Sequence, residues 1–243
     1  MMKPPGFDPA RRYPVLVYVY GEPWSQTVAD RYEHTRYLWH LYLTRLGYVV
    51  VSFDNRGTPS PRGRDWRKFV HRAIGIRAPA DQAAALETLL KRHDFLDRER
   101  VGIWGWSGGG SMSLHAIFKY PELYRMAMSV ASVTDLALYD TIYEERYMGL
   151  PADNPVGYRD GSPVNFADGL KGDLLLVHGT HDDNVHYQHA ELLVDRLIAE
   201  GKLFEMMSYP NRSHGIYERA NTRRHLFETL TSYLLRKLPA GPR

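Results

Sequence analysis

The sequence contains no cysteine and no long hydrophobic run. Without cysteine, its 243 residues hold no disulfide, no thiolate nucleophile and no thiolate zinc site, so covalent catalysis would need another side chain. No apolar run approaches the roughly 18 residues of a membrane helix. The start, MMKPPGFDPARR, lacks the apolar core of about 7–15 residues that a secretory signal contains. As written, the sequence predicts a soluble cytoplasmic protein without membrane contact, unless it is a fragment from which a targeting segment has been removed.

A strong excess of charge of one sign is also missing. The 31 Lys and Arg face 28 Asp and Glu, a formal net charge of +3. The arginine clusters at 62–72 and 223–224 are interleaved with acidic residues, which is typical of a solvated surface and not of a nucleic-acid footprint. We therefore expect no nucleic-acid partner.

The length and the 44% apolar content indicate one globular domain over residues 1–243, with residues 1–12 as an N-terminal segment leading into it. A chain of this size buries about 70–75% of the surface that its unfolded form exposes. It needs neither a metal nor a disulfide to fold, and nothing in its motifs calls for a metal site or a cofactor.

Short apolar runs alternate with segments of helical periodicity. The predicted strands cover residues 15–20, 48–53, 101–106, 126–130, 174–178 and 204–209. The predicted helices cover residues 36–46, 79–92, 111–120, 187–200 and 222–238, and Gly47 and Gly201 stand where C-cap glycines end two of them. This alternation predicts an α/β fold, with a mostly parallel sheet and helices on both of its faces.

Such a sheet places its ligand site at the carboxyl ends of the strands. The segments that follow the predicted strands are 21–24, 54–57, 107–110, 132–140, 179–185 and 210–215. We therefore look there for groups that carry chemistry.

Gly105-Trp106-Ser107-Gly108-Gly109 follows a predicted strand and leads into a predicted helix. This is the G-x-S-x-G pattern of a nucleophile elbow, in which the serine occupies a strained turn and a Cβ on either flanking glycine would clash. The pattern predicts Ser107 as a nucleophile, and a plain glycine-rich turn is the alternative interpretation.

A serine nucleophile needs a base, and the base needs a carboxylate that fixes its tautomer. In this fold the acid and then the histidine follow the serine along the chain. Asp182 and Asp183 lie after one later strand, and only one of two neighbouring side chains in a turn can face the base. We prefer Asp182, but spacing alone leaves the choice open, since either residue could cap the following helix.

Among the 11 histidines, His214 follows the last predicted strand and is the preferred base. His178 lies in an apolar strand end, where we expect a structural residue bonded to the backbone. His181 directly precedes the acid and could not easily reach around it.

A tetrahedral intermediate needs hydrogen-bond donors for its oxyanion. The backbone amide of Gly108 is one candidate, because it directly follows the nucleophile. The early loop at 20–24 lacks the glycine-rich run of lipases and esterases, so the Tyr20 hydroxyl is the candidate for the second donor. A core aromatic side chain is the alternative interpretation of Tyr20.

Several motifs resemble the catalytic domain of the prolyl oligopeptidase family, and most of all its dipeptidyl peptidase IV branch. They are GWSGG at 105–109, YDTIYEERYMGLP at 139–151, HGTHDDNVH at 178–186 and HG at 214–215. YPVLVYVYG at 13–21, SFDNRG at 52–57 and DQ at 81–82 extend the resemblance over nearly the whole chain. It implies an α/β-hydrolase fold and a serine peptidase that works without a cofactor.

The resemblance also implies roles for individual residues. Ser107 would be the nucleophile, Asp182 the acid and His214 the base, with Tyr20 and Gly108 binding the oxyanion. Tyr139 and Tyr143 would line a small pocket for a proline or alanine side chain, with Val133 and Val185 nearby, and Asn184 would bond a substrate carbonyl. An aromatic pocket with one oriented amide suits such a substrate physically.

The sequence departs from the family pattern in three ways. It holds no β-propeller, which in the family's dipeptidyl peptidases supplies the acidic pair that grips the substrate amine. Gly108 stands where the family usually has tyrosine, and Glu22 where it usually has glycine. A carboxylate at position 22 would either disfavour the oxyanion or bind a substrate amine.

These observations predict a serine peptidase that cleaves after proline or alanine, as a dipeptidyl peptidase does, through an acyl-enzyme. Its substrate would be a peptide or a small acyl compound. A carboxylesterase for small acyl esters is the first alternative, because an activated ester needs less anchoring than a peptide. A truncated, non-catalytic interaction domain is the second. An apolar edge left by the missing propeller would favour a homo-oligomer.

Overall fold

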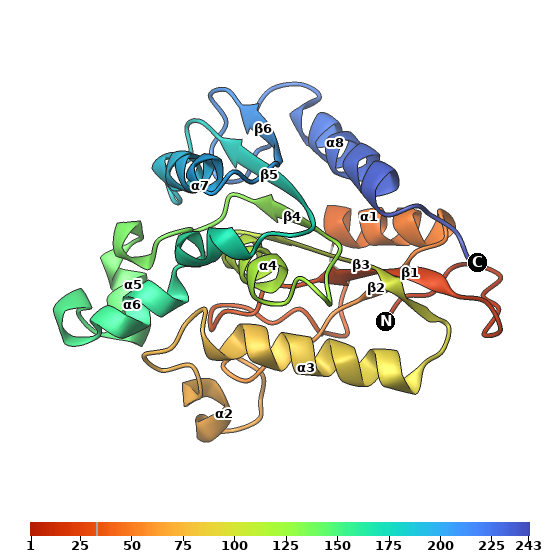
Figure 1. Cartoon of the computed structure of the whole chain (residues 1–243), viewed down its shortest axis with the longest axis horizontal. Helices are drawn as coiled ribbons and strands as arrows, with labels where there is room; N and C mark the ends of the chain where they lie inside the picture. Colours follow the sequence, from red (N-terminus) through yellow and green to blue (C-terminus); the bar gives the residue numbers. More distant parts are fainter. Residues whose placement is uncertain (33) are drawn as a thin grey trace.

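The computed structural model describes residues 1–32 and 34–243, and it contains one six-stranded sheet. Its strands are β1 (Tyr13–Tyr18), β2 (Val49–Val51), β3 (Leu96–Trp106), β4 (Met126–Val130), β5 (Asp173–Gly179) and β6 (Glu205–Tyr209). Their order is β2-β1-β3-β4-β5-β6, and every neighbouring pair is parallel (Figure 1). All six predicted strands are confirmed.

Helices connect these strands. The long ones are α1 (His34–Arg45), α3 (Arg77–Arg92), α4 (Gly108–Lys119), α7 (Gln188–Ala199) and α8 (Thr222–Lys237), and they confirm the five predicted helices. Shorter helices are α2 (Arg64–Lys68), α5 (Thr141–Met148) and α6 (Pro155–Gly161), with 3-10 turns at η1 (Leu136–Leu138), η2 (Pro151–Asp153) and η3 (Pro163–Gly169). The short helices were not predicted, because each is too short to show a helical period.

Two apolar cores lie on opposite faces of the sheet. Helices α3, α4 and α7 lie on one face, and helices α1 and α8 lie on the other (Figure 1). In β1, Val15 and Val17 face the first core while Leu16 faces the second, so the strand is buried along its whole length. This double burial explains why β1 is a continuous apolar run without a polar alternation.

The two ends of the described chain lie side by side. Met2 forms an antiparallel bridge with Val50 of β2, and the backbone of Arg12 exchanges two hydrogen bonds with Arg243. Arg100, in the first half of β3, donates to the carbonyl oxygens of Arg12, Pro239 and Gly241. The carboxyl ends of the strands, where the candidate site lies, are at the opposite edge of the sheet from this contact.

No helix in the described ranges combines the length and the apolar character that crossing a membrane requires.

Candidate active site

Ser107 occupies a sharp turn between β3 and α4. Its backbone has φ 58° and ψ −124°, a conformation that residues other than glycine rarely adopt. The chain passes very close to itself here: a Cβ at position 105 would lie 2.2 Å from the Gly109 carbonyl oxygen, and one at position 109 would lie 2.2 Å from that of Val19. The two glycines therefore permit the turn that presents Ser107 at the end of the strand, as the elbow pattern predicts.

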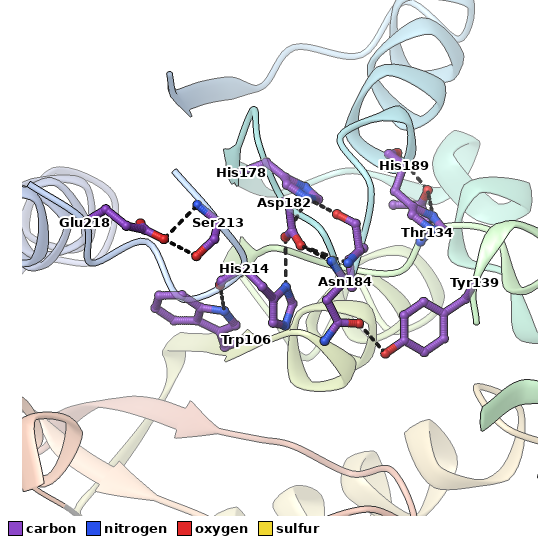
Figure 2. Close-up of polar contacts among 11 residues, drawn as sticks. Trp106, Thr134, Tyr139, His178, Asp182, Asn184, His189, Ser213, His214 and Glu218 are labelled. Atoms are coloured by element: carbon purple, nitrogen blue, oxygen red, sulfur yellow. Dashed lines mark hydrogen bonds and ion pairs between the residues drawn. The ribbon is translucent and has the colours of Figure 1, made fainter. Parts of the chain in front are cut away.

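Asp182 and His214 are brought together from the ends of β5 and β6. Asp182 Oδ2 lies 2.8 Å from His214 Nδ1, and the carboxylate is fully buried while the imidazole is 21% exposed (Figure 2). Because this carboxylate accepts the Nδ1 proton, the Nε2 atom of His214 is left as an acceptor. Asp183 is exposed and does not face the imidazole.

The other oxygen of Asp182 holds its own loop. Oδ1 accepts hydrogen bonds from the backbone amides of Asn184, at 3.0 Å, and Val185, at 2.9 Å. The carboxylate is thereby fixed by the backbone before it contacts the imidazole. No hydrogen bond joins Ser107 to His214 within the described residues.

His178 lies against the same carboxylate. Its Nε2 is 2.8 Å from the Val185 carbonyl oxygen and 3.2 Å from Asp182 Oδ2, so it carries a proton at Nε2 and bonds to the backbone. Burial by itself would raise the pKa of Asp182, but hydrogen bonds from His178 and His214 outweigh burial and hold the pKa well below its usual range. Asp182 is therefore ionised at neutral pH. The sequence reasoning missed this contact of His178 with the acid.

The loop that carries His214 is anchored at both ends. The Trp106 indole N–H, one residue before Ser107, donates to the His214 carbonyl oxygen at 3.0 Å, and Ser213 bonds to Glu218 through both its amide and its hydroxyl (Figure 2). The carbonyl oxygen of Arg212 would lie only 2.3 Å from a Cβ at Gly179. The three loops after β3, β5 and β6 are therefore packed against one another.

The two predicted oxyanion donors flank this turn. The amide of Gly108 opens α4, so it has no acceptor within the helix. Tyr20 follows β1, and its Cα would lie 3.2 Å from a Cβ at position 109. Burial and the nearby Glu22 raise the pKa of Tyr20 far above its usual value, so its hydroxyl stays protonated and able to donate.

Three tyrosines form an aromatic cluster next to the turn. The rings of Tyr139 and Tyr143 lie 5.7 Å apart, and those of Tyr143 and Tyr147 lie 5.0 Å apart, both edge to face. These rings pack on a buried cluster that contains Val133 and Val185. The resemblance described above assigns four of these five residues, all but Tyr147, to a substrate pocket, and we call the five the tyrosine pocket.

Asn184 borders the tyrosine pocket. Its Oδ1 accepts a hydrogen bond of 2.8 Å from the Tyr139 hydroxyl (Figure 2). Its Nδ2 makes no hydrogen bond to any residue of the described ranges. That N–H group is free to donate to a carbonyl, as the sequence analysis expects.

Two carboxyl groups are buried beside the pocket. Glu22 is 7% exposed and accepts a hydrogen bond of 2.9 Å from the Tyr143 hydroxyl, and Glu144 is 2% exposed. Burial raises the pKa of Glu22 to about 7, although the bond from Tyr143 lowers it, and burial together with Glu22 raises the pKa of Glu144 to about 9. The sequence reasoning singled out Glu22 but missed Glu144, because no helix was predicted at 141–148.

In residues 1–32 and 34–243, no three His, Asp or Glu side chains are arranged to hold a metal ion.

Comparison with curated proteins points to one family. Human dipeptidyl peptidase 8 is 39% identical over 219 residues, which are 89% of this chain and 24% of that protein. A probable dipeptidyl-aminopeptidase B of Uncinocarpus reesii is 39% identical over 237 residues, which are 96% of this chain and 25% of that protein. The chain thus spans about a quarter of the length of these relatives.

Solved structures agree. Dipeptidyl peptidase 4 of Porphyromonas gingivalis superposes with a TM-score of 0.92 at 39% identity, over 97% of this chain and 33% of that one. A putative dipeptidyl aminopeptidase IV of Bacteroides ovatus superposes with a TM-score of 0.91 at 37% identity, over 98% of this chain and 33% of that one. The predicted α/β-hydrolase fold is thereby confirmed, and the described residues contain no β-propeller. The model of the prolyl oligopeptidase family matches residues 34–240, and the chain belongs to this family.

Proposed function

We propose that the chain is the catalytic domain of a serine peptidase that cleaves peptides through an acyl-enzyme. One observation carries the proposal: the buried Asp182 carboxylate bonds the Nδ1 side of His214, in a loop that Trp106 ties to the Ser107 turn. This is the arrangement that an activated serine requires. The names of the relatives given above, dipeptidyl peptidases and a dipeptidyl-aminopeptidase, support the same reaction class.

In this mechanism His214 Nε2 takes the proton of Ser107 as Oγ attacks the substrate carbonyl. Asp182 stabilises the imidazolium that forms and fixes its tautomer. The Gly108 amide and the Tyr20 hydroxyl bind the oxyanion of the tetrahedral intermediate. His214 then gives its proton to the leaving amine, and water releases the acyl group by the same steps in reverse order.

The tyrosine pocket receives the side chain of the residue whose carbonyl is attacked, which we call the acyl-side residue. Proline and alanine fit between the tyrosine rings and the two valines, and Asn184 Nδ2 donates to a substrate carbonyl. Dipeptidyl specificity further requires a group that holds the substrate amine. The whole protein's specificity is therefore proposed by analogy with its relatives, of which this chain spans only a part.

An esterase is the second candidate. The observation that favours it is the 21% exposure of His214, which leaves the base accessible to small acyl esters. An activated ester needs neither a protonated leaving amine nor firm anchoring of the chain, so loss of anchoring contacts would slow amide hydrolysis more than ester hydrolysis.

Hydrolysis of a Gly-Pro anilide and of a short-chain nitrophenyl ester, each by wild type and by Ser107→Ala, tests the proposal. Cleavage of both substrates that is lost in the variant supports the peptidase. Cleavage of the ester alone favours the esterase. Labelling of Ser107 by a fluorophosphonate separates both from a non-catalytic domain, which would not be labelled.

A further inference from the structure

Glu22 and Glu144 form a pair of buried carboxyl groups without a cationic partner. In the described part of the chain, neither takes part in an ion pair with a lysine, arginine or histidine, and the bond from Tyr143 to Glu22 is the only side-chain hydrogen bond to the pair. Glu144 Oε2 is buried and has no hydrogen-bond partner at all. Buried carboxylates are usually paired with a cation or fully hydrogen-bonded, so this pair is incomplete as it stands.

The pair lies beside the candidate nucleophile. A Cβ at Gly108 would lie 2.5 Å from both Cδ and Oε2 of Glu22, so this carboxyl group fills space that a side chain next to Ser107 would take. Its partner Tyr143 belongs to the tyrosine pocket, and Glu144 follows Tyr143 directly on α5. Glu144 also acts electrostatically on Tyr139 and Tyr143, so both carboxyl groups border the tyrosine pocket.

Among the residues that the structure describes, no lysine, arginine or histidine of the surrounding elements balances the charge of the pair. Several ionisable groups interact electrostatically with the pair. They include Tyr20 before the loop, Tyr139 and Tyr143 in the tyrosine pocket, and Asp140 at the start of α5. All of them are neutral or acidic. A cation brought by a substrate would meet two carboxyl groups and several tyrosine hydroxyls. Because the site is buried and its dielectric constant is low, the attraction between the cation and a carboxylate is stronger there than in water.

We propose that Glu22 and Glu144 bind the cationic side chain of a lysine or arginine at the acyl-side position, so that the enzyme cleaves after basic residues. This inference rests on the proposed serine peptidase function and extends its substrates beyond proline and alanine. Glu22 binds the cation directly at the pocket wall. Glu144 places a second carboxyl group behind it, which is protonated in the free protein at neutral pH because its pKa is raised to about 9. The interaction is one that an apolar side chain of the same length cannot make.

The test compares two substrates that differ only in this charge: the thiobenzyl esters of N-acetyl-lysine and N-acetyl-norleucine. Both esters lack further residues, so no contact outside the tyrosine pocket affects them. We expect kcat/KM to be about tenfold or more higher for the lysine ester, the size expected of a hydrogen bond to a charged group. The ratio of the two rates cancels any pH effect on His214, because both esters use the same base.

The ratio should also depend on pH. Since the pKa of Glu22 is about 7 in the free protein, the carboxyl group is neutral below that pH and the lysine preference should grow as pH rises through it. In Glu22→Gln the ratio should fall about tenfold and lose this pH dependence. Glu144→Gln should lower it less, and Glu145→Gln, on the same helix but outside the pair, should leave it unchanged.

Thermal unfolding of each variant shows that it is folded under the assay conditions, and Glu144→Gln provides an independent reading should Glu22→Gln be unstable. Labelling of wild-type Ser107 by a fluorophosphonate keeps the two proposals apart. Equal hydrolysis of the two esters, a ratio that Glu22→Gln does not change, or no hydrolysis of the lysine ester by a protein that is labelled each overturns this inference alone. Failure of labelling overturns the proposed function and the inference with it.

Discussion

Asp182 bonds two different parts of the candidate site through its two oxygens. Oδ1 closes the turn through the amides of Asn184 and Val185, and Oδ2 faces His214 and His178. A carboxylate in this position is rigid before any substrate arrives, because backbone amides hold it. The rigid carboxylate fixes the orientation of the His214 imidazole, which is partly exposed and would otherwise be free to rotate.

Asp182→Asn should therefore damage catalysis far more than the fold. The asparagine oxygen can still accept from the backbone amides, but its NH₂ group then faces His214 Nδ1 and forces the proton onto Nε2. We expect kcat to fall by about 10⁴-fold, as for the wrong tautomer in a serine triad. The rate of hydrolysis of a nitrophenyl ester measures this.

Circular dichroism and thermal unfolding are the controls for Asp182→Asn, because a variant that does not fold says nothing about the tautomer. The matched variant Asp183→Asn changes the exposed neighbour and should keep the wild-type rate. A folded Asp182→Asn protein that retains a tenth or more of the wild-type kcat would contradict the assigned role.

At the scale of elements, the turn between β3 and α4 has no room for a side chain at Gly105 or Gly109. We expect Gly109→Ala to destabilise the fold by roughly 3 kcal/mol or more, since its Cβ would lie 2.2 Å from the Val19 carbonyl oxygen and this backbone atom cannot move aside. Gly201→Ala is the matched control: φ is +63° there but nothing lies within 4 Å, so it should cost only about 1 kcal/mol. Urea unfolding measures both, and equal losses would refute the close approach.

The elements differ in how well the sequence predicts them. Strands such as β1, YPVLVY, are continuous apolar runs because both faces of the sheet are covered, and they stand out in the sequence. The rule that ligands bind at the carboxyl ends of strands then placed Ser107, Asp182 and His214 in loops that the structure packs together. The choice between Asp182 and Asp183 was not available from spacing, because it depends on which side chain turns inward.

Helix α5 shows where prediction from sequence ended. Its eight residues, TIYEERYM, carry exposed apolar and buried acidic side chains, so binary patterning is reversed: Ile142 is 80% exposed and Glu144 is 2% exposed. A local sequence rule cannot foresee a buried glutamate, because neighbours that act on it, such as Glu22, lie far away along the chain. Such local conflicts concentrate at functional sites.

At the scale of the whole molecule, one buried ion pair links the two ends of the described chain. Arg100 contacts Asp97 at 2.7 Å, and both side chains are less than one tenth exposed. The same guanidinium donates to carbonyl oxygens near both ends, those of Arg12 and Gly241. Four of its five N–H donors are used, by the Asp97 carboxylate and by the carbonyl oxygens of Arg12, Pro239 and Gly241.

Arg100→Ala should therefore be costly for folding but neutral for the site. The variant leaves Asp97 buried without a cation and frees the carbonyl oxygens, so we expect a loss of about 3–5 kcal/mol in the free energy of unfolding. Lys171→Ala, which removes an exposed ion pair with Glu122, should cost less than about 1 kcal/mol. Urea unfolding at neutral pH compares the two variants. Because Arg100 lies in the first half of β3 and Ser107 follows its last residue, fluorophosphonate should label Ser107 at the wild-type rate below the unfolding transition. A loss as small as that of Lys171→Ala would show that the two ends hold together without Arg100, and slower labelling of the folded variant would show that this contact and the site are coupled through β3.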